Sequence, residues 1–274
     1  MVTYNEIGEG ITDEGSPDMK YYAFDWDDNI VTMPTKIILK DEDGNNVGMT
    51  TDDFSKYREI IGVEPFKYNG HMVVDYSEEP FKYFGTYGDK QFIIDSMLSK
   101  PGPAWDDFVE AINGGSIFAI VTARAHTPQA LKEACYNFIV SETNGISIKE
   151  LIKNLEKYRE ITGKEEGSKK DLINDYLDMC RFYPVSYGQS KSASKPEELK
   201  IQALKEFVNY VKKLSSKLKK QAFLKNDISN TFIPMVGFSD DDIKNLESVK
   251  SHFEKEPNNI IKTYSTSGGV KKPY

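Results

Sequence analysis

The sequence predicts an α/β fold, because short apolar runs alternate with segments that have the periodicity of helices. The three strongest runs each end in polar or acidic residues, and they cover residues 21–24, 116–121 and 232–238. Fully apolar strands are typical of a parallel sheet with helices on both faces, where neither face meets water. We therefore expect a Rossmann-like, three-layer α/β/α core around a parallel sheet, with inserted cap segments.

Two further segments, residues 181–188 and 259–266, are candidate strands of the same sheet. The first contains Pro184, which has no amide hydrogen to donate to a neighbouring strand, and this weakens the prediction. Helices are expected where apolar residues recur every three or four positions. The helical stretches are 105–113, 127–140, 146–161, 169–180 and 195–218.

The predicted core is discontinuous, and comprises residues 1–30, 101–140 and 181–274. The segment 31–100 is an expected cap-like insertion, and it begins with two β-like runs around the turn-rich sequence DEDGNN. That pattern predicts a β-hairpin. The segment 141–180 is expected to form a small helical insertion. Caps commonly shape access to a site, but neither segment carries a motif that names a substrate.

Composition and charge limit the classes of partner. The chain has 274 residues, 39% hydrophobic and 28% charged, which is typical of a soluble globular protein. Its net charge of -8 disfavours binding to nucleic acid or to an anionic membrane. Cys135 and Cys180 have no metal-ligand or disulfide spacing, and no signal peptide or membrane span is recognisable. We expect a soluble, cytoplasmic protein; the sequence does not indicate its oligomeric state.

Three carboxylates directly follow the first apolar strand, in the sequence FDWDDNI at residues 24–30. The crowding of Asp25, Asp27 and Asp28 is unfavourable unless a cation or solvent offsets the repulsion. A hard divalent ion such as Mg2+ prefers oxygen ligands, and ligands of open α/β sheets bind beyond the carboxyl ends of the strands. The sequence therefore predicts a magnesium site at this edge of the sheet.

The motifs that end the three strong strands resemble those of the haloacid dehalogenase superfamily. DWDDN (25–29) is similar to the first motif of that family, IFAIVTAR (117–124) to the second, and VGFSDDD (236–242) to the fourth. The three occur in the family's order. This resemblance implies a magnesium-dependent phosphomonoester hydrolase that acts on a small phosphorylated substrate and forms an aspartyl-phosphate on the enzyme.

By the same resemblance, Asp25 is the nucleophile, and Asp27 is the general acid/base that protonates the leaving oxygen and then activates water. Thr122 would bind the phosphoryl oxygens, and Arg124 would reach the phosphate or the leaving group. The third motif of the family requires a lysine near a helix start. Lys200 is our choice for that role, and the alternative is Lys195.

The resemblance also implies the ligands of the metal. Asp25, the main-chain carbonyl of Asp27 and acids of the fourth motif would hold Mg2+. Among those acids we favour Asp240 and Asp241, while Asp242 stays an alternative.

Two residues depart from the family pattern. Asn29 stands where Thr or Val is more usual, and Phe238 stands where an Asp usually follows the glycine. The irregular fourth motif motivates an alternative hypothesis, a binding or regulatory protein with the same fold and weak or no turnover. His126 could contact a substrate, although a surface or capping role is more common, and Trp26 could exclude water or simply pack in the core.

A further alternative, a phosphatase that acts on nucleotides or nucleic-acid ends, rests on a lysine-rich helix. A solvated helix face is the simpler interpretation of these lysines, because few aromatic residues lie among them. They are Lys212, Lys213, Lys217, Lys219 and Lys220.

Overall fold

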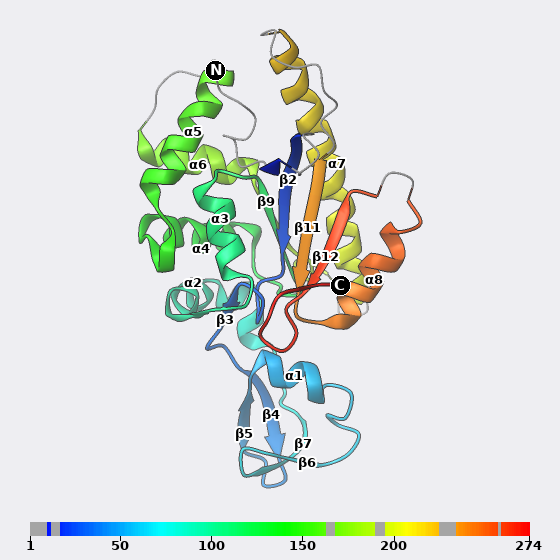
Figure 1. Cartoon of the computed structure of the whole chain (residues 1–274). Coiled ribbons are helices and arrows are strands. Elements are labelled where there is room, and N and C mark those ends of the chain that lie inside the picture. Colours follow the sequence, from blue (N-terminus) through cyan, green and yellow to red (C-terminus); the bar gives the residue numbers. More distant parts are fainter. Residues whose placement is uncertain (1–9, 12–16, 163–167, 190–194, 225–233, 257–258) are drawn as a thin grey trace.

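A central, mostly parallel sheet organises the chain (Figure 1). The computed structural model describes residues 10–11, 17–162, 168–189, 195–224, 234–256 and 259–274. The strand order is β10-β9-β2-β11-β12-β13; β10 to β12 run parallel, and β13 is antiparallel to β12. The short β1 pairs with β2 in antiparallel fashion. The strands are β1 (Gly10–Ile11), β2 (Pro17–Phe24), β9 (Phe118–Thr122), β10 (Arg181–Pro184), β11 (Pro234–Asp240), β12 (Ile261–Ser265) and β13 (Lys272–Pro273).

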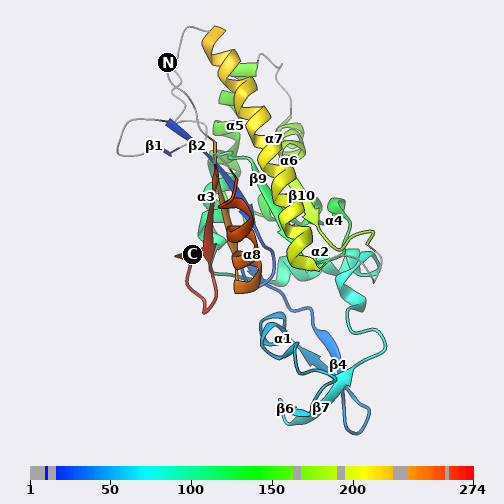
Figure 2. The same cartoon turned by 90° about the vertical axis from the view of Figure 1, so that its right-hand side faces the viewer.

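Helices cover both faces of this sheet, which confirms the predicted α/β fold (Figures 1 and 2). Figure 1 shows α3 to α6 on one side of the sheet and α7 and α8 on the other. The helix α7 contacts β2, β9 and β11, and α8 contacts β11 and β12. The helices are α3 (Trp105–Asn113), α4 (Pro128–Val140), α5 (Ile148–Thr162), α6 (Lys169–Met179), α7 (Pro196–Leu224) and α8 (Ile243–Phe253). Among the described residues, no helix is both long and apolar enough to cross a membrane.

The strand ends differ slightly from the sequence predictions. The strand β10 stops at Pro184 rather than at residue 188, because it lies at the sheet edge and a turn follows, in which the amide of Tyr187 donates to the carbonyl of Pro184 at 2.9 Å. The strand β11 reaches Asp240 instead of ending at residue 238, while residues 232–233 of the prediction lie outside the described residues. An acidic side chain therefore ends β11 itself.

The insertion forms a second, antiparallel sheet with the order β5-β4-β7-β6. Figure 1 shows it beyond the carboxyl ends of β2 and β11. The predicted hairpin around DEDGNN is confirmed, because β4 pairs with β5 with Ile37 opposite Met49. A short antiparallel pair, β3 with β8, joins the insertion to the core. The elements are β3 (Val31–Thr32), β4 (Ile37–Asp41), β5 (Asn46–Met49), α1 (Thr51–Tyr57), β6 (Phe66–Tyr68), β7 (His71–Tyr76) and β8 (Lys100–Pro101).

The insertion also contains a second hairpin, β6 to β7, that we did not predict. Its loop is Asn69-Gly70, and both residues have positive φ, 49° and 84°. An Asn-Gly pair between two apolar runs is a strong hairpin signal, since the tight turn that follows the twist of the strands needs positive φ at both positions. The signal was therefore present in the sequence.

The buried hydrophobic side chains form two separate clusters. A small cluster in the insertion is built from residues between Ile37 and Phe84. The helix α2 (Asp89–Leu98) contacts α4 and buries Phe92 in the main core. Helices α5 and α6 also contribute apolar side chains to the main core. The remaining short 3-10 helices are η2 (Lys82–Phe84), η3 (Thr86–Gly88) and η4 (Thr143–Gly145).

Candidate functional site

The strands β2 and β11 bring two acidic side chains to one edge of the sheet. Asp25 directly follows β2, and Asp240 ends β11. The strands are parallel neighbours, and the amide of Asp25 donates to the carbonyl of Ser239 at 2.9 Å. The chain order of the strands reverses here, because β9 and β10 lie on one side of β2, and β11 and β12 on the other. Crevices at such switch points are the usual binding sites of open α/β sheets.

A buried lysine bridges these two carboxylates. Lys200, in the second turn of α7, donates from Nζ to Oδ1 of Asp25 at 2.8 Å and to Oδ2 of Asp240 at 2.7 Å. Lys200 is 2% exposed. Lys195, the alternative in the sequence, is exposed and lines the cavity above the site. The structure thus brings Lys200 to the predicted nucleophile.

The acids form a group that suits a divalent cation. One carboxylate oxygen from each of Asp25, Asp240 and Asp241 lies within 4.8 Å of the others. Asp242 points elsewhere, because its side chain caps α8 by accepting from the amide of Lys244 at 2.9 Å. Three carboxylates beside a single ammonium leave an excess of negative charge, and hard cations such as Mg2+ prefer oxygen ligands of this kind.

The electrostatics of the group reflect this excess. Burial raises the pKa of Asp25 to about 8; Lys200 opposes that shift, and the charges of Asp240 and Asp27 add to it. Burial, followed by the charges of Asp240 and Asp25, also raises the pKa of Asp241 well above its usual value. Burial alone would lower the pKa of Lys200, but its two partners raise it above the ordinary value. Without a divalent ion, the group therefore retains protons near neutral pH.

This proton uptake predicts a pH-dependent effect of Mg2+ on stability. The native state holds the Asp25 proton more tightly than the unfolded chain, whose pKa is near 3.8. In EDTA, the free energy of unfolding should therefore fall as pH rises from about 5 to about 8. Mg2+ replaces the proton, so its stabilisation should grow over the same window, reaching about 2.7 kcal/mol at a hundredfold excess over Kd. Urea unfolding with and without Mg2+ measures both trends. An increase in the free energy of unfolding by Mg2+ that is equal at about pH 5 and at about pH 8 would contradict this account.

The general acid/base candidate, Asp27, lies beside the group and is held by Arg124. Nε and Nη2 of Arg124 donate to the two carboxylate oxygens of Asp27, each at 2.7 Å. Arg124 is 2% exposed, and its guanidinium carbon lies 4.4 Å from the ring centre of Phe84. We expected Arg124 at the phosphate or the leaving group, and the structure places it on Asp27. It therefore positions that carboxylate.

His126 extends this contact toward α2. Its Nε2 lies 3.3 Å from Nη1 of Arg124, and its Nδ1 lies 2.9 Å from Oδ1 of Asp89. Since a guanidinium only donates, Nε2 accepts and Nδ1 carries the hydrogen that is donated to Asp89. Burial, together with the charge of Arg124, lowers the pKa of His126 to about 4, so the ring is neutral. His126 is fully buried, so of the expected surface or capping roles the surface position is excluded.

Trp26, between the two catalytic candidates, points into the main core. It is fully buried, and its ring packs 5.9 Å from Phe138 and 5.3 Å from Phe92, measured between ring centres. Asp25 and Asp27 line the cavity at the site, whereas Trp26 does not, so the side chain of Trp26 points away from those of its two acidic neighbours. Of the two interpretations of Trp26, core packing fits the structure.

Asn29 connects the three chain segments that surround the site. Its Nδ2 donates to the carbonyl of Asp25 and to Oγ of Ser239, both at 3.0 Å. Its Oδ1 accepts from Oγ1 of Thr266 at 2.9 Å. The residue is fully buried. The position needs two donor hydrogens and one acceptor, which an amide provides and a Thr hydroxyl or a Val side chain does not. This gives a physical reason for Asn where the resembled motif more often has Thr or Val.

Replacing Asn29 by Ala should destabilise the protein, because three buried polar partners lose their hydrogen bonds. We expect the free energy of unfolding to fall by about 2 kcal/mol. Urea unfolding measures this change. The matched control is Asn46→Ala, at an exposed position, which should change stability by no more than about 0.5 kcal/mol. Equal effects of the two substitutions would show that the Asn29 contacts contribute nothing.

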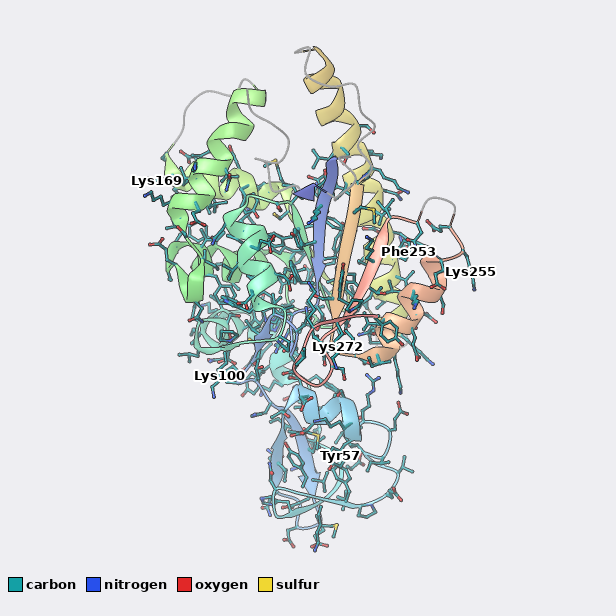
Figure 3. The ribbon with its side chains drawn as sticks, in the orientation of Figure 1. Tyr57, Lys100, Lys169, Phe253, Lys255 and Lys272 are labelled. Carbon is teal, nitrogen blue, oxygen red and sulfur yellow. The ribbon has the colours of Figure 1, made fainter. Side chains whose placement is uncertain are left out.

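The insertion lies over the site, and a cavity of about 1170 Å³ that is partly open to solvent lies between the two. The core contributes the acids, Lys200 and Thr122 to its walls, and the insertion contributes facing residues from α1 and from the segment that contains Phe81 and Phe84. Figure 3 labels Tyr57, the last residue of α1, in the insertion. Three polar contacts join α1 and its C-terminal end to the core. They are Thr51 with Asp28 at 2.5 Å, Arg58 with Asp242 at 3.0 Å, and Glu59 with Lys244 at 2.6 Å.

Two lysines of the lysine-rich helix can be placed relative to this cavity. In the part of the chain that the structure describes, Lys212 and Lys213 of α7 are not among the residues that line it. The side chains of Lys217, Lys219 and Lys220 lie outside the described residues.

We compared the chain with protein-family models, with curated proteins and with solved structures, and found no significant match.

Proposed function

We propose that this protein is a magnesium-dependent phosphomonoester hydrolase of the haloacid dehalogenase kind, which acts through an aspartyl-phosphate on Asp25. The observation that carries the proposal is the convergence of Asp25, Asp240 and Asp241 at the ends of two neighbouring strands, with Lys200 between them. The site opens into a cavity that the insertion covers. This arrangement agrees with the motif resemblance.

The donor set fits Mg2+, and Asp25, Asp240 and Asp241 would hold it. When bound, the ion would neutralise charge on the phosphoryl group during its transfer. Asp240 is well placed as a fixed ligand, because its carboxylate already accepts from Nδ2 of Asn245 at 3.0 Å and from the amide of Asp242 at 3.0 Å. These contacts keep the carboxylate in one orientation.

In the first step, a carboxylate oxygen of Asp25 attacks phosphorus. Lys200 holds Oδ1, so Oδ2 is the attacking oxygen. The new O–P bond forms as the bond from phosphorus to the leaving oxygen breaks, and Asp27 gives a proton to that oxygen. Thr122, which lines the cavity, would donate from its hydroxyl to a phosphoryl oxygen. Lys200 offsets part of the negative charge.

In the second step, Asp27 takes a proton from water, and that water attacks phosphorus. The O–P bond to Asp25 breaks, which releases inorganic phosphate and restores the carboxylate. A bidentate ion pair with Arg124 forms with a carboxylate and not with a carboxylic acid, so it suits the base that this step requires. To act as the acid in the first step, Asp27 must carry a proton and leave Arg124.

We favour turnover over a purely binding role because Asp27, the group that would hydrolyse the intermediate, lines the same cavity as Asp25. The position of Lys212 and Lys213 outside the cavity gives no support to nucleic-acid ends as substrates. The cytoplasm is the proposed location, since Cys135 and Cys180 are free and buried, as expected in a reducing compartment.

The test is release of inorganic phosphate from a generic aryl phosphate. We expect activity with Mg2+, loss of that activity in EDTA, and recovery when Mg2+ is restored. Release that does not depend on the metal would contradict the proposal. Binding of Mg2+ without turnover across a broad panel of phosphate esters would instead favour the regulatory alternative.

A further inference from the structure

The insertion presents an aromatic wall to the cavity. Phe54, Phe81 and Phe84 all line it. Their rings pack edge to face, with ring centres 5.5 Å apart for Phe54 and Phe81 and 5.9 Å apart for Phe81 and Phe84. Phe81 is 45% exposed, and among the large hydrophobic side chains that are exposed in the described residues, it alone lines this cavity. Tyr76 also contacts Phe81, with ring centres 6.2 Å apart. A ring that is held by three aromatic neighbours and still open to the cavity can pack against a ligand.

The aromatic wall begins beside the candidate general acid. The ring of Phe84 lies under the guanidinium of Arg124, which holds Asp27. A general acid must lie close to the leaving oxygen, so the rest of the leaving group extends from Asp27 toward the insertion. The cavity therefore has a charged end for the phosphoryl group, at Lys200 and Thr122, and an aromatic end for the leaving group.

The size and polarity of the cavity narrow the class of leaving group further. Its volume of about 1170 Å³ lies slightly above the range of ordinary ligand pockets, and far exceeds the needs of inorganic phosphate. Oxygen-bearing side chains also line it, from Asp28, Thr51 and Ser55. The hydroxyls of Thr51 and Ser55 already donate to Asp28 and to the carbonyl of Asp52, so these three side chains offer acceptor oxygens to the hydroxyls of a sugar. An aromatic ring packs well against Phe81 in an offset or edge-to-face arrangement.

We infer that the natural substrate is a nucleoside monophosphate, whose base packs on Phe81 while its phosphate meets Asp25. This inference rests on the proposed function, which it deepens by naming the substrate class. It is independent of the lysine-rich helix, because the recognition comes from the insertion. Phe81 is the specificity-determining residue, since its open ring contacts the part of the substrate that distinguishes it from other phosphomonoesters.

The test compares kcat/KM for a nucleoside monophosphate, phenyl phosphate and an alkyl phosphate, all with Mg2+. Phe81→Ala should lower kcat/KM for the nucleoside monophosphate by about tenfold, mainly through KM, as expected for loss of one stacking contact. It should leave kcat/KM for the alkyl phosphate unchanged. The separate variant Phe81→Tyr keeps an aromatic ring and should therefore keep the preference for the nucleoside monophosphate. The matched control is Tyr87→Ala, which removes an aromatic side chain that is 76% exposed and outside the cavity.

A second measurement separates this inference from the proposed function. Calorimetry on Asp25→Asn and on the double variant Asp25→Asn/Phe81→Ala measures nucleoside monophosphate binding without turnover, and we expect about tenfold weaker binding to the double variant. Hydrolysis of phosphate esters without preference for the nucleoside, or an unchanged preference in Phe81→Ala, would overturn the inference and leave the function standing. Equal values of kcat/KM for phenyl phosphate and for the nucleoside monophosphate would also overturn the inference. Binding that depends on Phe81 but is not followed by hydrolysis in the wild type would overturn the function, and with it the assignment of the nucleotide as a substrate.

Discussion

Replacing Asp25 by Asn should reduce phosphate release by more than about a thousandfold. The amide has the same shape and its Oδ1 can still accept from Lys200, but its oxygen is a poor nucleophile that does not form the acyl phosphate. The loss should appear in kcat, because the attacking group is missing while most contacts to the substrate stay. Steady-state release of phosphate from an aryl phosphate with Mg2+ measures it.

Two observations keep this result interpretable. The variant should fold as well as the wild type in EDTA, because burial already opposes the charged form of Asp25 and raises its pKa to about 8. Asp43→Asn makes the same chemical change at an exposed position in the β4–β5 turn and should keep full activity. Activity of Asp25→Asn close to that of the wild type would exclude Asp25 as the nucleophile.

Replacing Lys200 by Met should both destabilise the protein and remove its activity. The substitution leaves the carboxylates of Asp25 and Asp240 buried without their shared cation, and breaking a buried ion pair from one side costs about 3–5 kcal/mol. Mg2+ should recover part of this loss, since the ion places positive charge between the same acids. Urea unfolding in EDTA and in Mg2+ measures both effects.

Lys195→Met is the matched control for this substitution. Lys195 also lines the cavity, but it is exposed, so the same change there should alter stability by no more than about 0.5 kcal/mol. The comparison also tests the choice between the two lysines of the third motif. If Lys195→Met were the more damaging substitution, the assignment of Lys200 would be wrong.

The core of the fold was predictable because its strands are apolar on both faces. All residues of β9 are buried, and such a strand has few alternatives to the middle of a covered parallel sheet. The acids that follow β2 and end β11 could then be expected to meet, since parallel neighbours end at the same edge. Which of the three consecutive acids face Asp25 required the structure, because Asp242 serves instead as the cap of α8.

The helix α2 escaped prediction for a physical reason. Its outer face exposes Ile94 and Leu98, at 53% and 70%, while Asp95 is buried. Asp95 is satisfied there because it accepts from Oγ1 of Thr35 and from Nε2 of Gln91, both at 2.8 Å. Apolar residues outside and an acid inside invert the pattern on which helix prediction depends.

The contacts that position Asp27 could not be inferred from the sequence either. Arg124 lies 97 residues from Asp27 along the chain, and Asp89 lies 37 residues from His126. Arg124 and Asp27 follow the neighbouring strands β9 and β2, whereas the pairing of His126 with Asp89 depends on how the insertion returns to the core through α2. A sequence motif indicates that an arginine follows the second strand, but not whether its guanidinium binds the substrate or another side chain.

The most direct test of the central claim is to locate the transferred phosphoryl group. The wild type and Asp27→Asn are mixed with an aryl phosphate and Mg2+, quenched in acid after a short time, and digested for mass spectrometry. We predict one phosphoryl group on the peptide that contains Asp25, accumulating in Asp27→Asn because hydrolysis of the intermediate is slowed. Turnover by the wild type with no phosphorylated peptide in either protein, or with the label on another residue, would contradict the account.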